Sequence, residues 1–185
     1  MKEQRGNQEE LVNNIIQIER VMFQQVQTSE PSICQERVET FKAMRKMTHS
    51  VLSTETLASY LNDLQKAGVK GRNLLRDKYA RMQDLIPPLK TNPVIEKICE
   101  FETRWMMQLS VRYPGTFQAG SNFRTYLSCE LETYSDRTIN LYFRDVLKAD
   151  YKGRNLVEER YAELAKDLGY SSLDHMVEAT LQKST

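Results

Sequence analysis

Apolar residues recur at helical spacing along most of the chain. In the first stretch they fall four or seven residues apart, and they are Leu11, Ile15, Met22 and Val26. Residues at these steps share one face of an α-helix, so the pattern predicts an amphipathic helix over residues 8–27. Glu30 and Pro31 follow, and the proline ends this helix.

The rest of the chain continues this pattern. Its spacing and its capping residues predict further helices over residues 32–50, 53–67, 73–85, 94–109, 123–131, 136–149, 155–168 and 172–181. Ser53 or Thr54 caps the third helix, and Asn73 caps the fourth. No pair of segments alternates with the period of two that marks a β-strand. We therefore predict an all-α fold.

An internal repeat indicates two copies of one helical unit. Residues 53–80 align with residues 135–162, and 13 of the 28 aligned residues are identical. Self-similarity of this kind is typical of tandem structural repeats. The predicted organisation is a first four-helix repeat, a linker, a second four-helix repeat and a C-terminal helix with its tail, at residues 1–87, 88–92, 93–170 and 171–185. We expect the two repeats to be related by a pseudo-twofold axis and to pack as one compact domain.

Two acidic residues lie on the apolar faces of predicted helices. Glu19 is four residues after Ile15, and Glu102 is four residues after Ile98. A carboxylate on a core-facing stripe needs a partner or loses its charge, because burying it unpaired is costly. Two roles therefore remain open for each acid: an ion pair or hydrogen bond that fixes the fold, or a functional carboxylate.

The repeated Lys-Gly-Arg-Asn-Leu motif is the sharpest candidate for a binding site. Its polar members are Lys70, Arg72 and Asn73 in the first copy, and Lys152, Arg154 and Asn155 in the second. The glycine permits the left-handed turn that ends one helix, and the asparagine caps the next. A guanidinium beside a helix N-terminus suits a carboxylate or phosphate. Two destinations remain open for the two arginines: they pair with the buried acids, or they bind an anion in a shared cleft.

A second repeated feature is a tyrosine followed three residues later by an aspartate. The pairs are Tyr60 with Asp63, and Tyr142 with Asp145. Residues at this spacing share a helix face, and most such faces are solvated. If the two loops converge, these phenols and carboxylates suit a polar pocket, so we count the four residues among the candidate ligand-binding residues.

Composition narrows the function classes. The formal net charge of +1 gives no general case for nucleic-acid binding, and no apolar run reaches the ~20 residues of a membrane span. The two histidines lack the spacing of a di-iron or zinc site. We therefore expect no metal, no cofactor, no nucleic-acid partner and no membrane partner. The three cysteines are expected to be reduced thiols in a cytoplasmic protein.

Several short motifs are spread over nearly the whole chain. They are Glu19-x-x-Met22-Phe23, Cys34-Gln35, Thr40-Phe41, Leu57-x-x-Tyr60-x-x-Asp63-Leu64 and Gly71-Arg72-Asn73-Leu74-x-x-Lys78-Tyr79. Their order resembles an uncharacterised bacterial all-helical family that is known only as a domain of unknown function. The resemblance implies a bacterial and cytoplasmic setting, and it implies no activity, cofactor or catalytic residue.

Three functions remain open from the sequence. The repeated basic loops favour a helical binding or interaction domain, with a cleft for a small anionic ligand or for an acidic segment of a protein partner. The second is an enzyme in which Glu19 or Glu102 acts as a general base at a raised pKa while an arginine holds an anionic substrate. The third is a purely structural adaptor. A homo-oligomer is compatible with each of them.

Overall fold

The computed structural model describes residues 2–26, 38–118 and 120–183 of the chain. Over these ranges the backbone forms nine α-helices and no β-strand, which confirms the all-α prediction. In chain order the helices are α1 (Lys2–Gln24), α3 (Val38–His49), α4 (Thr54–Val69), α5 (Leu74–Met82), α6 (Pro93–Arg112), α7 (Ser121–Leu131), α8 (Asp136–Tyr151), α9 (Leu156–Asp167) and α10 (Leu173–Lys183). The predicted end of the first helix at residue 27 and start of the second at residue 32 lie outside the described ranges.

The predicted capping residues stand at the starts of α4 and α5, as expected. The hydroxyl of Ser53 accepts a hydrogen bond from the backbone N–H of Thr56, and the side-chain oxygen of Asn73 accepts one from Arg76. Between these two helices Gly71 has a φ of +66°, a left-handed conformation that glycine adopts without steric cost. The chain therefore turns from α4 into α5 where the sequence predicts it.

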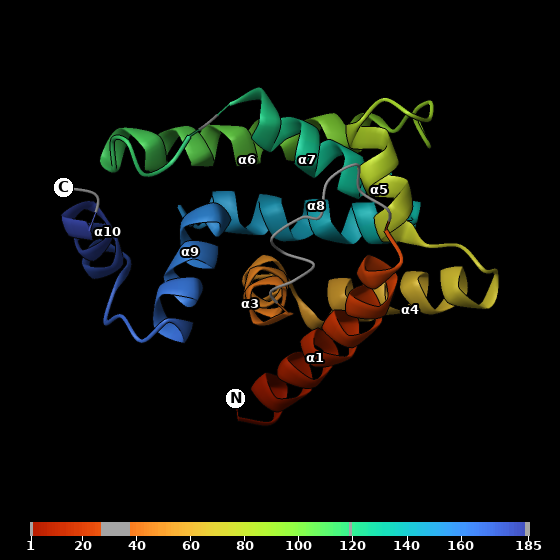
Figure 1. The fold of residues 1–185 in the computed structure, drawn as a ribbon, viewed down its shortest axis with the longest axis horizontal. Coiled ribbons are helices and arrows are strands. Elements are labelled where there is room, and N and C mark those ends of the chain that lie inside the picture. Colours follow the sequence, from red (N-terminus) through yellow and green to blue (C-terminus); the bar gives the residue numbers. More distant parts are fainter. Residues whose placement is uncertain (1, 27–37, 119, 184–185) are drawn as a thin grey trace.

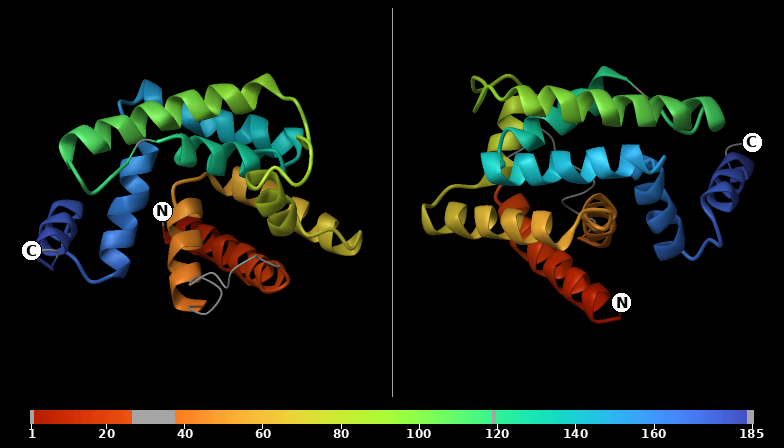
Figure 2. Two further views of the ribbon diagram at one scale, coloured as in Figure 1. Left: turned by 45° about the horizontal axis from the view of Figure 1, so that its top comes forward. Right: turned by 180° about the vertical axis from the view of Figure 1, so that it is seen from behind.

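Helices α4 and α8 lie side by side and run antiparallel near the middle of the molecule (Figures 1 and 2). The backbone N–H of Ser53, at the start of α4, donates to Asp145 in the second half of α8, with an N–Oδ2 distance of 2.9 Å. Ser135, at the start of α8, donates to Asp63 of α4 at 3.0 Å in the same way. α1 packs against α4, and α6 packs against α8.

Each predicted repeat supplies a helix that packs on the other repeat. α3, from the first, packs against α9 of the second, and α5 of the first packs against α7 of the second. One hydrophobic core runs through both, with Ile15 and Leu57 fully buried in the first and Ile98 and Ile139 in the second. The helices therefore form one packed body. The pseudo-twofold relation and the division at residues 88–92 stay predictions.

Candidate functional site

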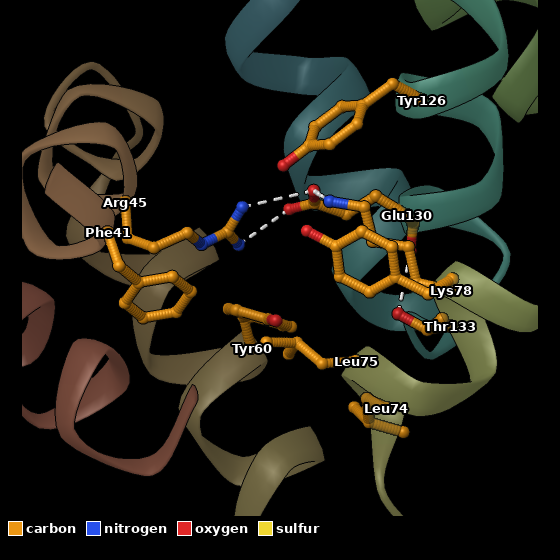
Figure 3. Close-up of a pocket in the computed structure, with 10 residues that line it drawn as sticks. Phe41, Arg45, Tyr60, Leu74, Leu75, Lys78, Tyr126, Glu130 and Thr133 are labelled. Carbon is orange, nitrogen blue, oxygen red and sulfur yellow. Dashed lines mark hydrogen bonds and ion pairs between the residues drawn. The ribbon is translucent and has the colours of Figure 1, made fainter. Parts of the chain in front are cut away.

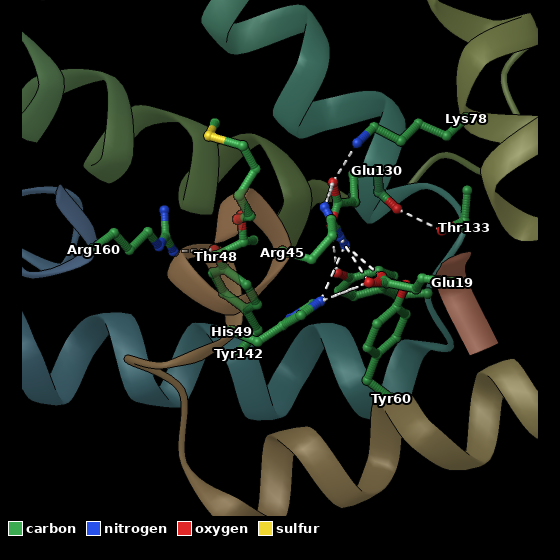
Figure 4. Close-up of polar contacts among 12 residues, drawn as sticks. Glu19, Arg45, Thr48, His49, Tyr60, Lys78, Glu130, Thr133, Tyr142 and Arg160 are labelled. Carbon is green, nitrogen blue, oxygen red and sulfur yellow. Dashed lines mark hydrogen bonds and ion pairs between the residues drawn. The ribbon is translucent and has the colours of Figure 1, made fainter. Parts of the chain in front are cut away.

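Glu19 of α1 is fully buried and is held by a guanidinium from α3 (Figure 4). The Nε atom of Arg45 lies 2.8 Å from Oε2 of Glu19, and Nη2 lies 2.5 Å from Oε1. The hydroxyl of Tyr60 donates to the same carboxylate at 2.8 Å, and Nε2 of His49 lies 3.3 Å from it. Burial alone would raise the pKa of Glu19, but Arg45 and His49 together lower it to about 2.

Arg45 also holds a second buried carboxylate, Glu130 of α7 (Figure 3). Its Nη2 lies 2.8 Å from Oε1 of Glu130, and Nζ of Lys78 lies 2.5 Å from Oε2. The hydroxyl of Tyr134 donates to Oε1 at 2.9 Å. Burial would raise the pKa of Glu130, but the two cations hold it well below its usual range. Two acids and two bases thus alternate through the core, and their charges cancel.

A separate buried ion pair joins Glu102 of α6 to Arg160 of α9. Nη1 and Nη2 of Arg160 lie 2.6 Å and 2.8 Å from the two carboxylate oxygens, and the hydroxyl of Tyr142 donates to Oε1 at 2.5 Å. Both terminal nitrogens of the guanidinium are therefore used. The Nε–H of Arg160 is buried and finds no acceptor among the described residues.

The inward pairing that was one of the two destinations open for the arginines of the repeated motif is wrong. Arg72 instead donates from Nε to Asp77, five residues later, at 2.7 Å, and Arg154 makes the equivalent bond to Glu159 at 2.7 Å. Both guanidinium groups are exposed, because each turn follows the end of a helix at the molecular surface. Glu19 and Glu102 instead take their cations from α3 and α9.

The two repeated turns do not form one cleft. They follow the ends of α4 and α8, and because these helices are antiparallel the turns lie at opposite ends of the pair (Figure 1). Lys70 and Lys152 are exposed there. Asn73 is buried and donates to the backbone oxygen of Met22 at 2.7 Å, in addition to capping α5. Asn155 caps α9 and donates in the same way to α6.

The structure separates the tyrosines from the aspartates. Tyr60 and Tyr142 point to the buried acids as described above. Asp63 instead accepts from the hydroxyl of Thr138 at 2.6 Å, and Asp145 accepts from Thr56 at 2.6 Å. Each aspartate therefore binds the first turn of the other central helix, and no single polar pocket gathers all four candidates.

A cavity of about 260 Å³ lies among α3, α7, α8 and α9, beside the Glu102–Arg160 pair. Met47, Leu127 and Val157 give it apolar walls. Four tyrosines also line it, namely Tyr126, Tyr134, Tyr142 and Tyr161. Its charged lining residues are Glu102, Glu130 and Arg160. Apolar walls and buried charges therefore meet in this cavity.

The cations that pair with the buried acids were not among the residues predicted from the sequence. Arg45 lies four residues after Phe41, and Arg160 lies four residues after Leu156, so both occupy core-facing helical positions. Lys78 and Arg160 also occupy the same place in the repeat, 82 residues apart. A search for cations on apolar faces finds all of them.

Three further findings concern metal ligands, membrane-spanning helices and thiols. In the part of the chain that the structure describes, no group of three or more His, Cys, Asp or Glu side chains is placed to hold a metal ion. None of the helices there is long and apolar enough to cross a membrane. Cys99 and Cys129 are free and buried, and burial raises the pKa of Cys99 to about 12. Cys34 lies outside the described ranges.

A comparison with models of protein families identifies a match. A family model described as "Protein of unknown function (DUF4125)" matches residues 9–178. No curated protein matches the chain, and no solved structure does. The match confirms the resemblance of the sequence motifs to a domain of unknown function.

Proposed function

We propose that this chain, which belongs to that family of unknown function, is a small-molecule binding domain. Its ligand occupies the cavity among α3, α7, α8 and α9. A binding domain is also the function that the sequence favours. The proposed site, however, lies in the core and not at the repeated basic turns.

One observation carries the proposal, namely the unpaired Nε–H of Arg160. Arg160 is only 6% exposed and lines the cavity. A buried donor without an acceptor costs about 1–3 kcal/mol, and most buried polar groups in proteins have a partner. A ligand with an acceptor at this point removes that cost, so the arginine favours an occupied cavity.

The lining of the cavity also suits a ligand site. Small-molecule sites are largely apolar and aromatic, with a few polar groups that orient the ligand. Here the apolar walls come from three different helices, and Arg160 stands among them with its guanidinium fixed by Glu102. A guanidinium fixed in this way presents its Nε–H in one direction, which favours recognition of a defined group.

The core acids favour binding over general-base catalysis. A general base needs a pKa near the working pH and an oxygen that reaches the substrate. Burial would raise the pKa of Glu19, but Arg45 and His49 outweigh that effect and lower the pKa to about 2. Glu130 is held well below its usual pKa as well, because Arg45 and Lys78 outweigh burial. The carboxylates of Glu19 and Glu102 each accept two hydrogen bonds from one guanidinium group.

A panel of one-ring and two-ring compounds tests this function by thermal denaturation. Ligand at a hundred times its dissociation constant should stabilise the native protein by about 2.7 kcal/mol. We expect Leu127→Trp, which fills the cavity, to abolish the stabilisation. The matched control is Leu147→Trp, at a position of α8 that is 44% exposed, and it should respond like the unsubstituted protein. A panel without any stabilising compound contradicts the proposal, as does an equal response in Leu127→Trp.

A further inference from the structure

We infer that the ligand of this cavity is uncharged, with a compact ring-containing body and one hydrogen-bond acceptor that binds Nε of Arg160. The inference rests on the proposed function and narrows it to a chemical class, of which aryl ketones and cyclic amides are examples. Three features of the lining carry it: the balance of charge, the unpaired donor, and the size and aromatic character of the walls.

The charge balance disfavours an anionic ligand. Of the charged lining residues two are acids, Glu102 and Glu130, and one is a base, Arg160. The base is already paired with Glu102, with 2.6 Å between Nη1 and Oε2. An anion in the cavity therefore finds no uncompensated cation, because Arg160 is paired with Glu102 and the charge of Glu130 is balanced by Arg45 and Lys78. It would lose its hydration without gaining an ion pair in exchange, which is costly.

A cationic ligand is disfavoured for the complementary reason. Each oxygen of Glu130 already accepts hydrogen bonds, Oε1 from Arg45 and Tyr134 and Oε2 from Arg45 and Lys78. Both oxygens of Glu102 accept as well. A ligand cation would lose its hydration and gain no free acceptor in exchange, which is costly.

The unpaired donor defines the polar group of the ligand. Among the described residues four buried side-chain nitrogen and oxygen atoms lack a partner, on His49, Thr103, Thr116 and Arg160. Only Arg160 lines the cavity. Since its free group is an N–H, the ligand must offer an acceptor there, such as a carbonyl oxygen. One donor calls for one acceptor, and the remaining ligand surface meets apolar and aromatic walls.

The cavity volume sets the size of the body. A cavity of 150 Å³ holds benzene, so by proportion about 260 Å³ holds about ten heavy atoms. The rings of Tyr126, Tyr134 and Tyr161 are among the walls, and aromatic pairs favour offset or edge-to-face contact. A flat ring that carries a short carbonyl substituent fits both the volume and the lining.

Three probes of nearly equal size separate the possibilities. Acetophenone has a ring and a neutral acceptor, cumene has the ring without the acceptor, and benzoate carries a negative charge. We expect acetophenone to bind about tenfold more tightly than cumene, because one hydrogen bond to a charged donor lowers the dissociation constant by about that factor. Benzoate should bind most weakly. Dissociation constants from NMR titration of the full chain measure the order.

A substitution at the anchor completes the test. Arg160→Lys keeps a cation beside Glu102 but removes the guanidinium N–H, so the preference for acetophenone over cumene should disappear. The double variant Glu102→Gln with Arg160→Met serves the same purpose without leaving an unpaired charge, if the single variant fails to fold. Arg154→Lys is the matched surface control, because that guanidinium is exposed, and it should keep the preference.

The outcomes distinguish this inference from the proposed function. If panel compounds bind but acetophenone is not preferred over cumene and benzoate, the ligand class is overturned while the binding function stands. A preference that persists in both anchor variants also overturns the ligand class. If no compound of the panel binds, both proposals fall.

Discussion

Arg45 and Glu130 form a buried ion pair with 2.8 Å between Nη2 and Oε1, although they lie 85 residues apart in the chain. They come from helices α3 and α7, which belong to different predicted repeats. Arg45 also holds Glu19 of α1. A single guanidinium thus joins three helices in the core, and several measurable properties depend on it.

The first prediction is a large loss of stability in Arg45→Met. The substitution leaves Glu19 with no guanidinium and Glu130 with Lys78 alone, and removing one partner of a buried pair typically costs about 3–5 kcal/mol. The free energy of unfolding in urea measures the loss.

Arg72→Ala is the control for that experiment. Its guanidinium is exposed and pairs only with Asp77, so the expected loss is below about 1 kcal/mol. Equal losses in the two variants would contradict the assignment of Arg45 as the partner of the core acids.

The second prediction concerns coupling between Glu102 and Arg160. Each single substitution, Glu102→Gln or Arg160→Met, leaves a buried group without its partner, whereas the double variant removes both charges together. We expect the double variant to lose less stability than the sum of the single losses, by about 0.5–3 kcal/mol. Additive losses in urea denaturation would mean that the two side chains do not interact.

The third prediction is a loss of stability in acid. Burial would raise the pKa of Glu19, but Arg45 and His49 lower it from 4.5 to about 2 on folding. A carboxyl group with a lowered pKa stabilises the fold above its unfolded pKa and loses that contribution as the pH falls toward its folded pKa. The free energy of unfolding should therefore fall between about pH 4.5 and pH 2. Glu19→Gln should show a shallower dependence, and an unchanged slope would refute the lowered pKa.

The fourth prediction tests the pseudo-twofold relation. Asp63 and Asp145 each accept a backbone N–H and a threonine hydroxyl from the opposite central helix. Asp63→Asn and Asp145→Asn should therefore cost similar amounts, of about 1–3 kcal/mol. Chemical denaturation of the two variants side by side gives the comparison. Losses that differ strongly would speak against equivalent roles in the two repeats.

Most of the helices could be predicted because local chemistry determines where they begin and end. Ser53 and Asn73 cap their helices through hydrogen bonds to residues three positions later, so no distant part of the chain is needed. Gly71 ends a helix for an equally local reason. The first helix begins earlier than predicted, at Lys2, because its first residues carry no apolar stripe that could reveal it.

The partners of the core acids could not be assigned from local patterns. Glu19 was expected at an apolar position and is buried there, but its choice between Arg72 and Arg45 depends on which helices pack together. Arg72 finds an acid five residues away, and this short-range contact competes with any long-range one. The cavity depends in the same way on contacts between α3 and α9, which are distant in sequence.

Because α3 packs on α9 and α5 packs on α7, the helices themselves hold the two parts of the polypeptide together on either side of residues 88–92. Residues 88–92 link the two parts of the polypeptide at high effective concentration. They add a few polar contacts of their own, such as those from Leu89 N–H to Glu132 at 3.0 Å and from Asn92 to Asp136 at 3.1 Å, while the helix packing is made elsewhere. A protein nicked by a protease within this segment should therefore stay assembled as a complex of its own fragments. Its separation would require the same buried charges and apolar surfaces to be exposed as in unfolding.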